Sequence, residues 1–153
     1  GFGADAIVAS FAVGPEGKVT GIESQPLIET VVGYGLAHFK AENWPIQEAM
    51  RGIETVCADA FSYLKQQEDD SVDVVYFDPM FRHPLLESRS LSPLRTVANH
   101  APVSPAMIEE ACRVARRRVV FKENARSLEF ERLGFTQIMG GRYSKVHYGV
   151  RIL

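Results

Sequence analysis

The sequence predicts an α/β fold with a mostly parallel sheet and a C-terminal antiparallel hairpin. Short apolar runs rich in β-branched and aromatic residues alternate with segments of helical period along most of the chain. Residues 73–77 are almost uninterrupted by polar side chains, which is typical of a strand buried on both faces of a parallel sheet. The last two predicted strands flank a Gly-Gly turn, and this spacing is typical of a hairpin.

The N-terminal half is expected to place two strands among several helices. A glycine turn at residues 1–6 opens a short apolar helix that ends near Gly14. In doubly wound folds such a turn follows a strand, so we expect the first strand of the sheet to lie upstream of Gly1 in a longer natural protein. The remaining predicted elements are a strand at 18–23, a helix at 26–40, a short helix at 46–51, a strand at 54–59 and a helix at 60–67.

The C-terminal half begins with the strand at 73–77, which must stop at Asp78-Pro79 because proline has no N–H to donate to a sheet ladder. Residues 82–104 are rich in proline and serine and show no clear period, so they are expected to form a substrate-facing loop. A helix at 105–116, a strand at 118–122 and a helix at 127–133 are predicted next. The hairpin strands at 134–139 and 146–152 follow.

Length and composition indicate a single domain that binds a small molecule. The chain has 153 residues and a mass of 17.0 kDa, and its net charge of −2 disfavours a protein that coats nucleic acid. No apolar run approaches the roughly 20 residues that span a bilayer. The cysteines, Cys57 and Cys112, lie in apolar segments and are expected to be buried thiols of a protein in the reducing cytoplasm.

Three acidic residues follow three successive predicted strands. They are Glu23, Asp59 and Asp78, and the carboxyl ends of parallel strands meet at one edge of a sheet, where ligands bind. Together with the glycines of the opening turn, they favour a polar cofactor that carries a diol and an amine. A metal site is disfavoured because the only nearby histidine, His83, has no partner at ligand spacing.

Taken together, these motifs resemble a known enzyme family. The order is Gly-x-Gly-x-Asp-Ala at residues 1–6, Glu23 after the next strand, Asp59-Ala60 after the third, and Asp-Pro-Met-Phe at residues 78–81. This order resembles the class I S-adenosylmethionine-dependent methyltransferases with a Rossmann-like fold. More narrowly, Val-Val-Tyr-Phe-Asp-Pro-Met-Phe and Val-Val-Phe-Lys at 119–122 resemble the RsmJ-like family, which methylates guanine N2 in small-subunit ribosomal RNA.

The resemblance implies an S-adenosylmethionine-binding domain over residues 1–153, truncated at its N-terminus, and a role for each matching residue. The glycine turn would contact the methionine part of the cofactor. Glu23, at the end of its strand, and Ser24 would contact the ribose. Asp59 and Ala60 would contact the adenine side. Asp78 would border both cofactor and substrate. The implied cofactor-binding residues are Gly1, Gly3, Ala4, Asp5, Glu23, Ser24, Asp59, Ala60 and Asp78.

Catalysis is expected to depend on Asp78, Pro79 and Phe81. The Asp78 carboxylate and the Pro79 carbonyl are candidate acceptors for the hydrogens of an exocyclic amine, and Phe81 is a candidate stacking surface for the base. Two other functions stay open. An NAD-dependent oxidoreductase would also use Gly1, Gly3 and Glu23, and a non-catalytic RNA-binding module would keep the fold without the reaction.

Overall fold

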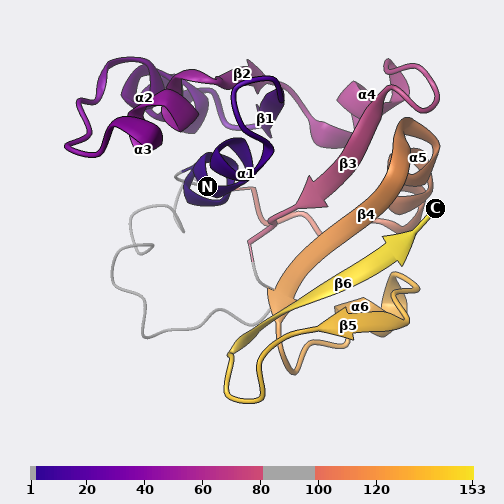
Figure 1. Cartoon of the computed structure of the whole chain (residues 1–153). Helices are drawn as coiled ribbons and strands as arrows, with labels where there is room; N and C mark the ends of the chain where they lie inside the picture. The colour runs from indigo at the N-terminus through magenta and orange to yellow at the C-terminus, as the bar shows by residue number, and fades with distance from the viewer. Residues whose placement is uncertain (1–2, 81–98) are drawn as a thin grey trace. The chain divides into compact units, whose positions relative to one another are not determined.

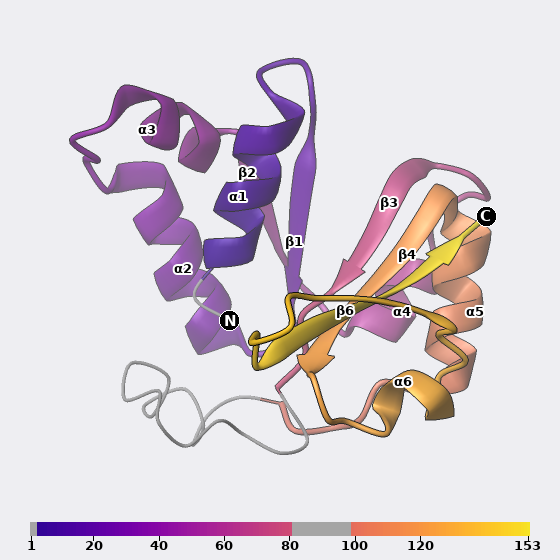
Figure 2. The ribbon, with the colours of Figure 1, turned by 60° about the horizontal axis from the view of Figure 1, so that its bottom comes forward.

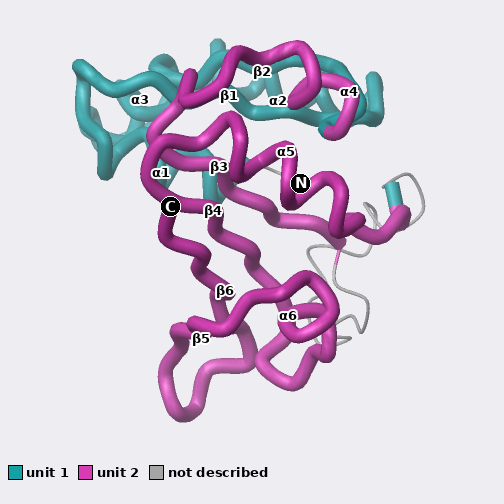
Figure 3. Tube along the Cα trace, turned by 90° about the vertical axis from the view of Figure 1, so that its right-hand side faces the viewer, with its two compact units in different colours: residues 1–60, 94–99 teal, residues 61–93, 100–153 magenta. Residues whose placement is uncertain are grey.

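The computed structural model describes residues 3–80 and 99–153 of the chain. These residues form two compact units, which Figure 3 shows in different colours. Unit 1 contains residues 3–60 and Asn99, and unit 2 contains residues 61–80 and 100–153. The single domain expected from the sequence stays a prediction.

Unit 1 is a pair of parallel strands with three helices. Helix α1 (Ala4–Val13) precedes β1 (Val19–Glu23), and α2 (Pro26–His38) and α3 (Trp44–Arg51) lead to β2 (Ile53–Cys57). The strands pair in parallel from Val19 opposite Ile53 to Glu23 opposite Cys57. Helices α1 and α2 both contact the two strands, and α3 contacts α1, α2 and β2 (Figure 1).

The helix boundaries of unit 1 follow from local chemistry. Pro26 lies in the first turn of α2, where its missing N–H costs no hydrogen bond. The Asn43 side chain caps α3 by accepting the N–H of Ile46 at 3.4 Å, with Pro45 in the first turn. Trp44-Pro45 therefore begins α3, two residues before the predicted start at residue 46.

Unit 2 is built around a four-stranded mixed sheet. Its elements are α4 (Ala60–Lys65), β3 (Val72–Phe77), α5 (Pro105–Val114), β4 (Ala115–Asn124), α6 (Glu129–Arg132), β5 (Gln137–Met139) and β6 (Val146–Ile152). The first residue of α4, Ala60, is still part of unit 1. The strand order is β3-β4-β6-β5. Strands β3 and β4 are parallel, whereas β6 runs antiparallel to both β4 and β5 (Figure 2). The predicted C-terminal hairpin is confirmed by the pairing of β5 with β6.

An aromatic cluster forms the core of unit 2 on one face of this sheet. Phe121 of β4 is 1% exposed, stacks on Phe135 at 5.6 Å between ring centroids, and meets Phe130 edge-on at 5.9 Å. Helix α5 covers the same face with Ile108, Ala111 and Val114, which are buried at helical spacing. Because successive side chains of a strand alternate between faces, Lys122 belongs to the opposite face from Phe121.

Arg113 in the last turn of α5 joins that helix to the segment before β3. Its guanidinium pairs with Asp69 at 2.5 Å and Glu110 at 2.9 Å, and donates to the carbonyls of Leu64 and Gln67. Hydrogen bonds raise the pKa of Arg113 above its ordinary value; the bond to the Asp69 carboxylate has the larger effect and the bond to Glu110 the smaller one. Arg113 therefore has a structural role at the end of α5.

Three expectations from the sequence are wrong in detail. Strand β3 is not covered on both faces among the described residues, since Val74 is 44% and Tyr76 41% exposed. Cys57 is exposed rather than buried, and Cys112 is half-buried. The helix predicted to reach residue 116 ends at Val114, because Ala115 is extended and already pairs with Val72 of β3.

Candidate functional site

The carboxyl ends of β1 and β2 form one polar edge in unit 1. Glu23 is the last residue of β1, and its carboxylate accepts the N–H of Gln25 at 3.0 Å. The Ala58 N–H donates to the Glu23 carbonyl at 3.0 Å, which holds the start of the loop after β2 against the end of β1. Asp59 follows in this loop and is exposed, two residues beyond the strand that was predicted to include it.

Ser24 extends this edge with a hydroxyl group. It is half-buried, and its Oγ accepts a hydrogen bond from the Asn99 side chain at 3.3 Å. Asn99 was not singled out from the sequence, because 75 residues separate it from Ser24 and no motif joins the two. Unit 1 therefore places a carboxylate and a hydroxyl in sequence at the end of β1, a suitable pair for binding ribose hydroxyls.

The glycine turn lies at the N-terminus of α1. Gly3 is the N-cap residue with φ of 79°, a left-handed conformation that residues with a side chain rarely adopt. A Cβ atom at Gly3 would lie 3.2 Å from Cγ1 of Val32, which is tighter than ordinary contact. The backbone here therefore depends on glycine, and it leads into the first turn of α1, which carries Ala4 and Asp5.

The carboxyl ends of β3 and β4 form a second polar edge in unit 2. Asp78 directly follows β3, and its Oδ1 lies 3.2 Å from the ammonium of Lys122 on β4. Phe77 and Phe121 are partners in the parallel ladder, so Asp78 and Lys122 continue the register by one residue. Pro79 and Met80 come next and are half-buried.

The structure brings some of the predicted site residues together within one unit, and the contact of the others with them stays a prediction. Glu23 and Ser24 share one edge with the loop that holds Asp59, all in unit 1, whereas Asp78 and Pro79 belong to unit 2. A common cleft for the three carboxylates stays a prediction. Gly1 and Phe81, and the expected loop at 82–104 up to residue 98, lie outside the described residues.

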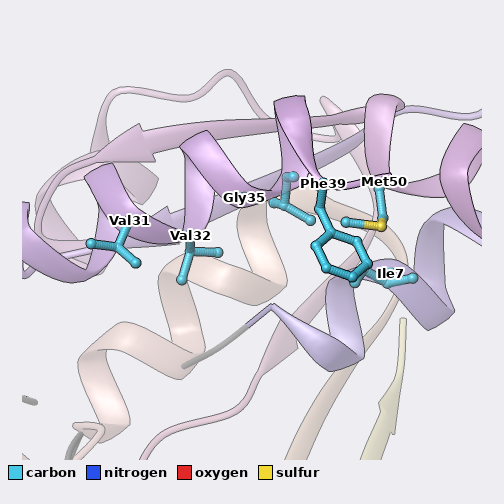
Figure 4. Close-up of a pocket in the computed structure, with 7 residues that line it drawn as sticks. Ile7, Val31, Val32, Gly35, Phe39 and Met50 are labelled. Atoms are coloured by element: carbon cyan, nitrogen blue, oxygen red, sulfur yellow. The ribbon is translucent and has the colours of Figure 1, made fainter. Parts of the chain in front are cut away.

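Unit 1 also has an apolar hollow of about 230 Å³ between its helices (Figure 4). Figure 4 shows Phe39, directly after α2, beside Ile7 of α1 and Met50 of α3, with Val31 and Val32 further along α2. None of the described residues that line it is titratable, so they offer no group for proton transfer or for binding a charge. The polar edge at Glu23 is the better candidate for a cofactor site.

Within residues 3–80 and 99–153, no group of three or more His, Cys, Asp or Glu side chains is arranged to hold a metal ion. No helix in the same residues is long and apolar enough to cross a membrane.

The fold is that of the Rossmann-like methyltransferases. The chain superposes with a TM-score of 0.62 on the crystal structure of the SAM-dependent methyltransferase NGO1261 from Neisseria gonorrhoeae, at 17% sequence identity, over 97% of this chain and 56% of that one. This likeness confirms the predicted fold class.

The sequence defines the family. The model of the family described as "Putative SAM-dependent methyltransferase" matches residues 1–139, and the chain belongs to this family, whose cofactor is S-adenosylmethionine. The chain is 44% identical to the uncharacterized protein YpiP of Bacillus subtilis over 98% of its length. It is 30% identical to ribosomal RNA small subunit methyltransferase J of Pseudomonas fluorescens over 80% of its length. It spans 58% and 46% of these two relatives.

Proposed function

We propose that this protein transfers a methyl group from S-adenosylmethionine to an exocyclic amine of a base, guanine N2, in small-subunit ribosomal RNA. The observation that carries the proposal is Asp78-Pro79 at the carboxyl end of β3, within a chain of this methyltransferase family. The similarity to ribosomal RNA small subunit methyltransferase J supports the RNA substrate. An acceptor on the ribosome implies a cytoplasmic enzyme.

The residues of unit 1 suit the cofactor. The Glu23 carboxylate would accept hydrogen bonds from the two ribose hydroxyls, and its contact with the Gln25 N–H limits the directions it can take. Asp59 and Ala60 would contact the adenine side of the cofactor. The turn formed by Gly3, Ala4 and Asp5 would contact its methionine part. When bound, the cofactor supplies an electrophilic methyl group on a positively charged sulfur.

The residues of unit 2 suit the acceptor amine. The lone pair of an exocyclic amine is delocalised into the ring, so the nitrogen is a poor nucleophile. Hydrogen-bond acceptors placed on its two hydrogens favour a pyramidal nitrogen and stabilise the positive charge that develops on it. The Asp78 carboxylate and the Pro79 carbonyl are adjacent candidates for this role, and Phe81 is the candidate stacking partner, worth about 1–3 kcal/mol per base.

The direct test is methyl transfer to small ribosomal subunits isolated from cells that lack this enzyme. Labelled S-adenosylmethionine should mark one guanine, and mapping of the labelled nucleotide should place the methyl group on N2. Calorimetry with S-adenosylhomocysteine and with NAD provides the cofactor control. Binding of NAD alone would contradict the proposal, and S-adenosylhomocysteine binding without transfer to any subunit would favour the non-catalytic module.

A further inference from the structure

We propose that the turn between β5 and β6, residues 140–145, binds unpaired nucleotides that flank the methylated base. Tyr143 would stack on a base, and Arg142 and Arg126 would bind phosphate groups. This inference rests on the proposed function, since it names the surface through which the same enzyme holds its RNA. It follows from the place of the turn in unit 2, the exposure of its aromatic ring and the charges around that ring.

The turn lies at the carboxyl end of the sheet, where Asp78 also lies. Strand β3 ends where Phe77 pairs with Phe121, and β4 continues to Asn124, which pairs with Val146 at the start of β6. The turn joins β5 to β6 beyond this last pair (Figure 1). Because β6 lies two strands from β3, strand spacing and rise place the turn on the order of 15 Å from Asp78, a length that a few stacked nucleotides span.

Tyr143 is the base-stacking group of this surface. It is 89% exposed, the highest value among the exposed large hydrophobic side chains of the described residues. The guanidinium of Arg142 lies 5.6 Å from the centroid of its ring, within the range of a cation–π contact. An exposed aromatic ring can stack on any base, because every base has a π-face, and arginine strengthens such sites. The pair therefore has the two features of a platform for single-stranded RNA.

The cations of this surface are not used for internal ion pairs. Among the residues that the structure describes, neither Arg126 nor Arg142 pairs with a carboxylate, whereas Arg113 pairs with two. Asp and Glu are absent from the sequence of the turn at 140–145 and from residues 125–128, which link β4 to α6. The chain has a net charge of −2, yet this end of the sheet offers exposed cations for phosphate groups.

Hydrogen bonds hold the turn in one conformation and join it to the segment after β4. The Ala125 N–H donates to the carbonyl of Lys145 at 3.0 Å, which brings the two segments together. Within the turn, the Ser144 N–H donates to the carbonyl of Gly141 at 2.9 Å, and Nε2 of His147 lies 3.4 Å from the same carbonyl. A surface that is ordered before it binds loses less conformational entropy on binding, so the aromatic ring and the cations are presented at low cost.

The stacking role is tested by steady-state kinetics of the full chain with unmodified small ribosomal subunits. Tyr143→Ala should raise the KM for subunits roughly 5- to 100-fold, the range expected when one base-stacking contact is lost. It should change kcat and the affinity for S-adenosylhomocysteine by less than about threefold, because the turn holds neither the acceptor amine nor the cofactor. Tyr143→Phe should keep the wild-type KM, since it keeps the ring. Ile152→Ala is the control, because it removes a side chain that is 68% exposed at the opposite end of β6.

The phosphate contacts are tested by the binding of a fluorescein-labelled oligouridylate of roughly ten nucleotides, measured by anisotropy over a range of KCl concentrations. Each phosphate contact of a single strand contributes about 0.7 to the slope of log K against log salt, so Arg126→Gln combined with Arg142→Gln should reduce the slope by about 1.4. Arg117→Gln removes an exposed cation from the opposite end of β4 and should leave the slope unchanged. A purely structural role of the two arginines would not alter the slope.

Two results would overturn this inference alone. One is an unchanged KM for Tyr143→Ala when the wild type methylates subunits, and the other is an unchanged salt slope for the double arginine variant. A wild type that methylates no subunit would overturn the proposed function, and oligouridylate binding would then decide this inference by itself. Weaker binding by Tyr143→Ala together with the smaller slope would support the surface, and a wild type that does not bind the oligouridylate would overturn it.

Discussion

Replacing Gly3 by alanine should weaken both cofactor binding and the stability of the fold. Gly3 has φ of 79°, and the left-handed conformation costs an ordinary residue about 1–2 kcal/mol. The added Cβ would also press on Val32 from 3.2 Å, so the turn or the helix must move by a few tenths of an ångström. For a chain of this size, a loss of 1–2 kcal/mol corresponds to a fall in Tm of roughly 2 to 8 °C.

Gly14→Ala is the matched control for this prediction. Gly14 ends the same helix with φ of 76° and ψ of −174°, a region that is essentially restricted to glycine and costs other residues about 1–3 kcal/mol. A Cβ at Gly14 would meet no atom within 4 Å. Gly14→Ala should therefore lose at least as much stability as Gly3→Ala without disturbing the turn that precedes α1.

The assay combines thermal unfolding with calorimetric titration of S-adenosylhomocysteine. Gly3→Ala should weaken binding at least about tenfold, equivalent to about 1.4 kcal/mol, because the turn is displaced where the methionine part is expected. Gly14→Ala should bind as the wild type does at a temperature where both variants are folded. Equal affinities in the two variants would refute the role assigned to the Gly3 turn, and an unchanged Tm in Gly3→Ala would refute the argument from backbone strain.

Three further predictions concern the polar edges and the core. Asp78→Ala should abolish methyl transfer to small ribosomal subunits while calorimetry still detects S-adenosylhomocysteine; full activity would remove Asp78 from the mechanism. Glu23→Ala should weaken S-adenosylhomocysteine binding roughly 10- to 100-fold, since hydrogen bonds to a charged group are worth about 1.5–3 kcal/mol. Glu16→Ala, in the turn before β1, is its control, and equal affinities would contradict the ribose role. Phe121→Ala should cost about 3–5 kcal/mol of unfolding free energy in urea, because the buried ring stacks on Phe135 and meets Phe130 edge-on. A loss below about 1 kcal/mol would show that this cluster is not the core.

The sequence by itself determined the elements and the family of this protein. The switch between periods of about 3.6 and 2 residues identified the strands and most helices to within a few residues, because each pattern follows from which side chains must face a core. Asp78-Pro79 ended its strand as expected, since proline cannot continue a ladder. The glycine turn, the strand-ending acids and Asp-Pro-Met-Phe led to the methyltransferase family, which the family match over residues 1–139 confirms.

Tertiary structure alone decided which side chains meet. Local patterns carry no information on register between segments 44 residues apart, so the contact of Lys122 with Asp78 had to come from the pairing of β3 with β4. Strand order had the same origin, because β6 lies between β4 and β5 although it follows both in the chain. The exposure of Tyr76 likewise depends on what packs on each face of the sheet, and the sequence of an apolar strand does not determine which elements pack there.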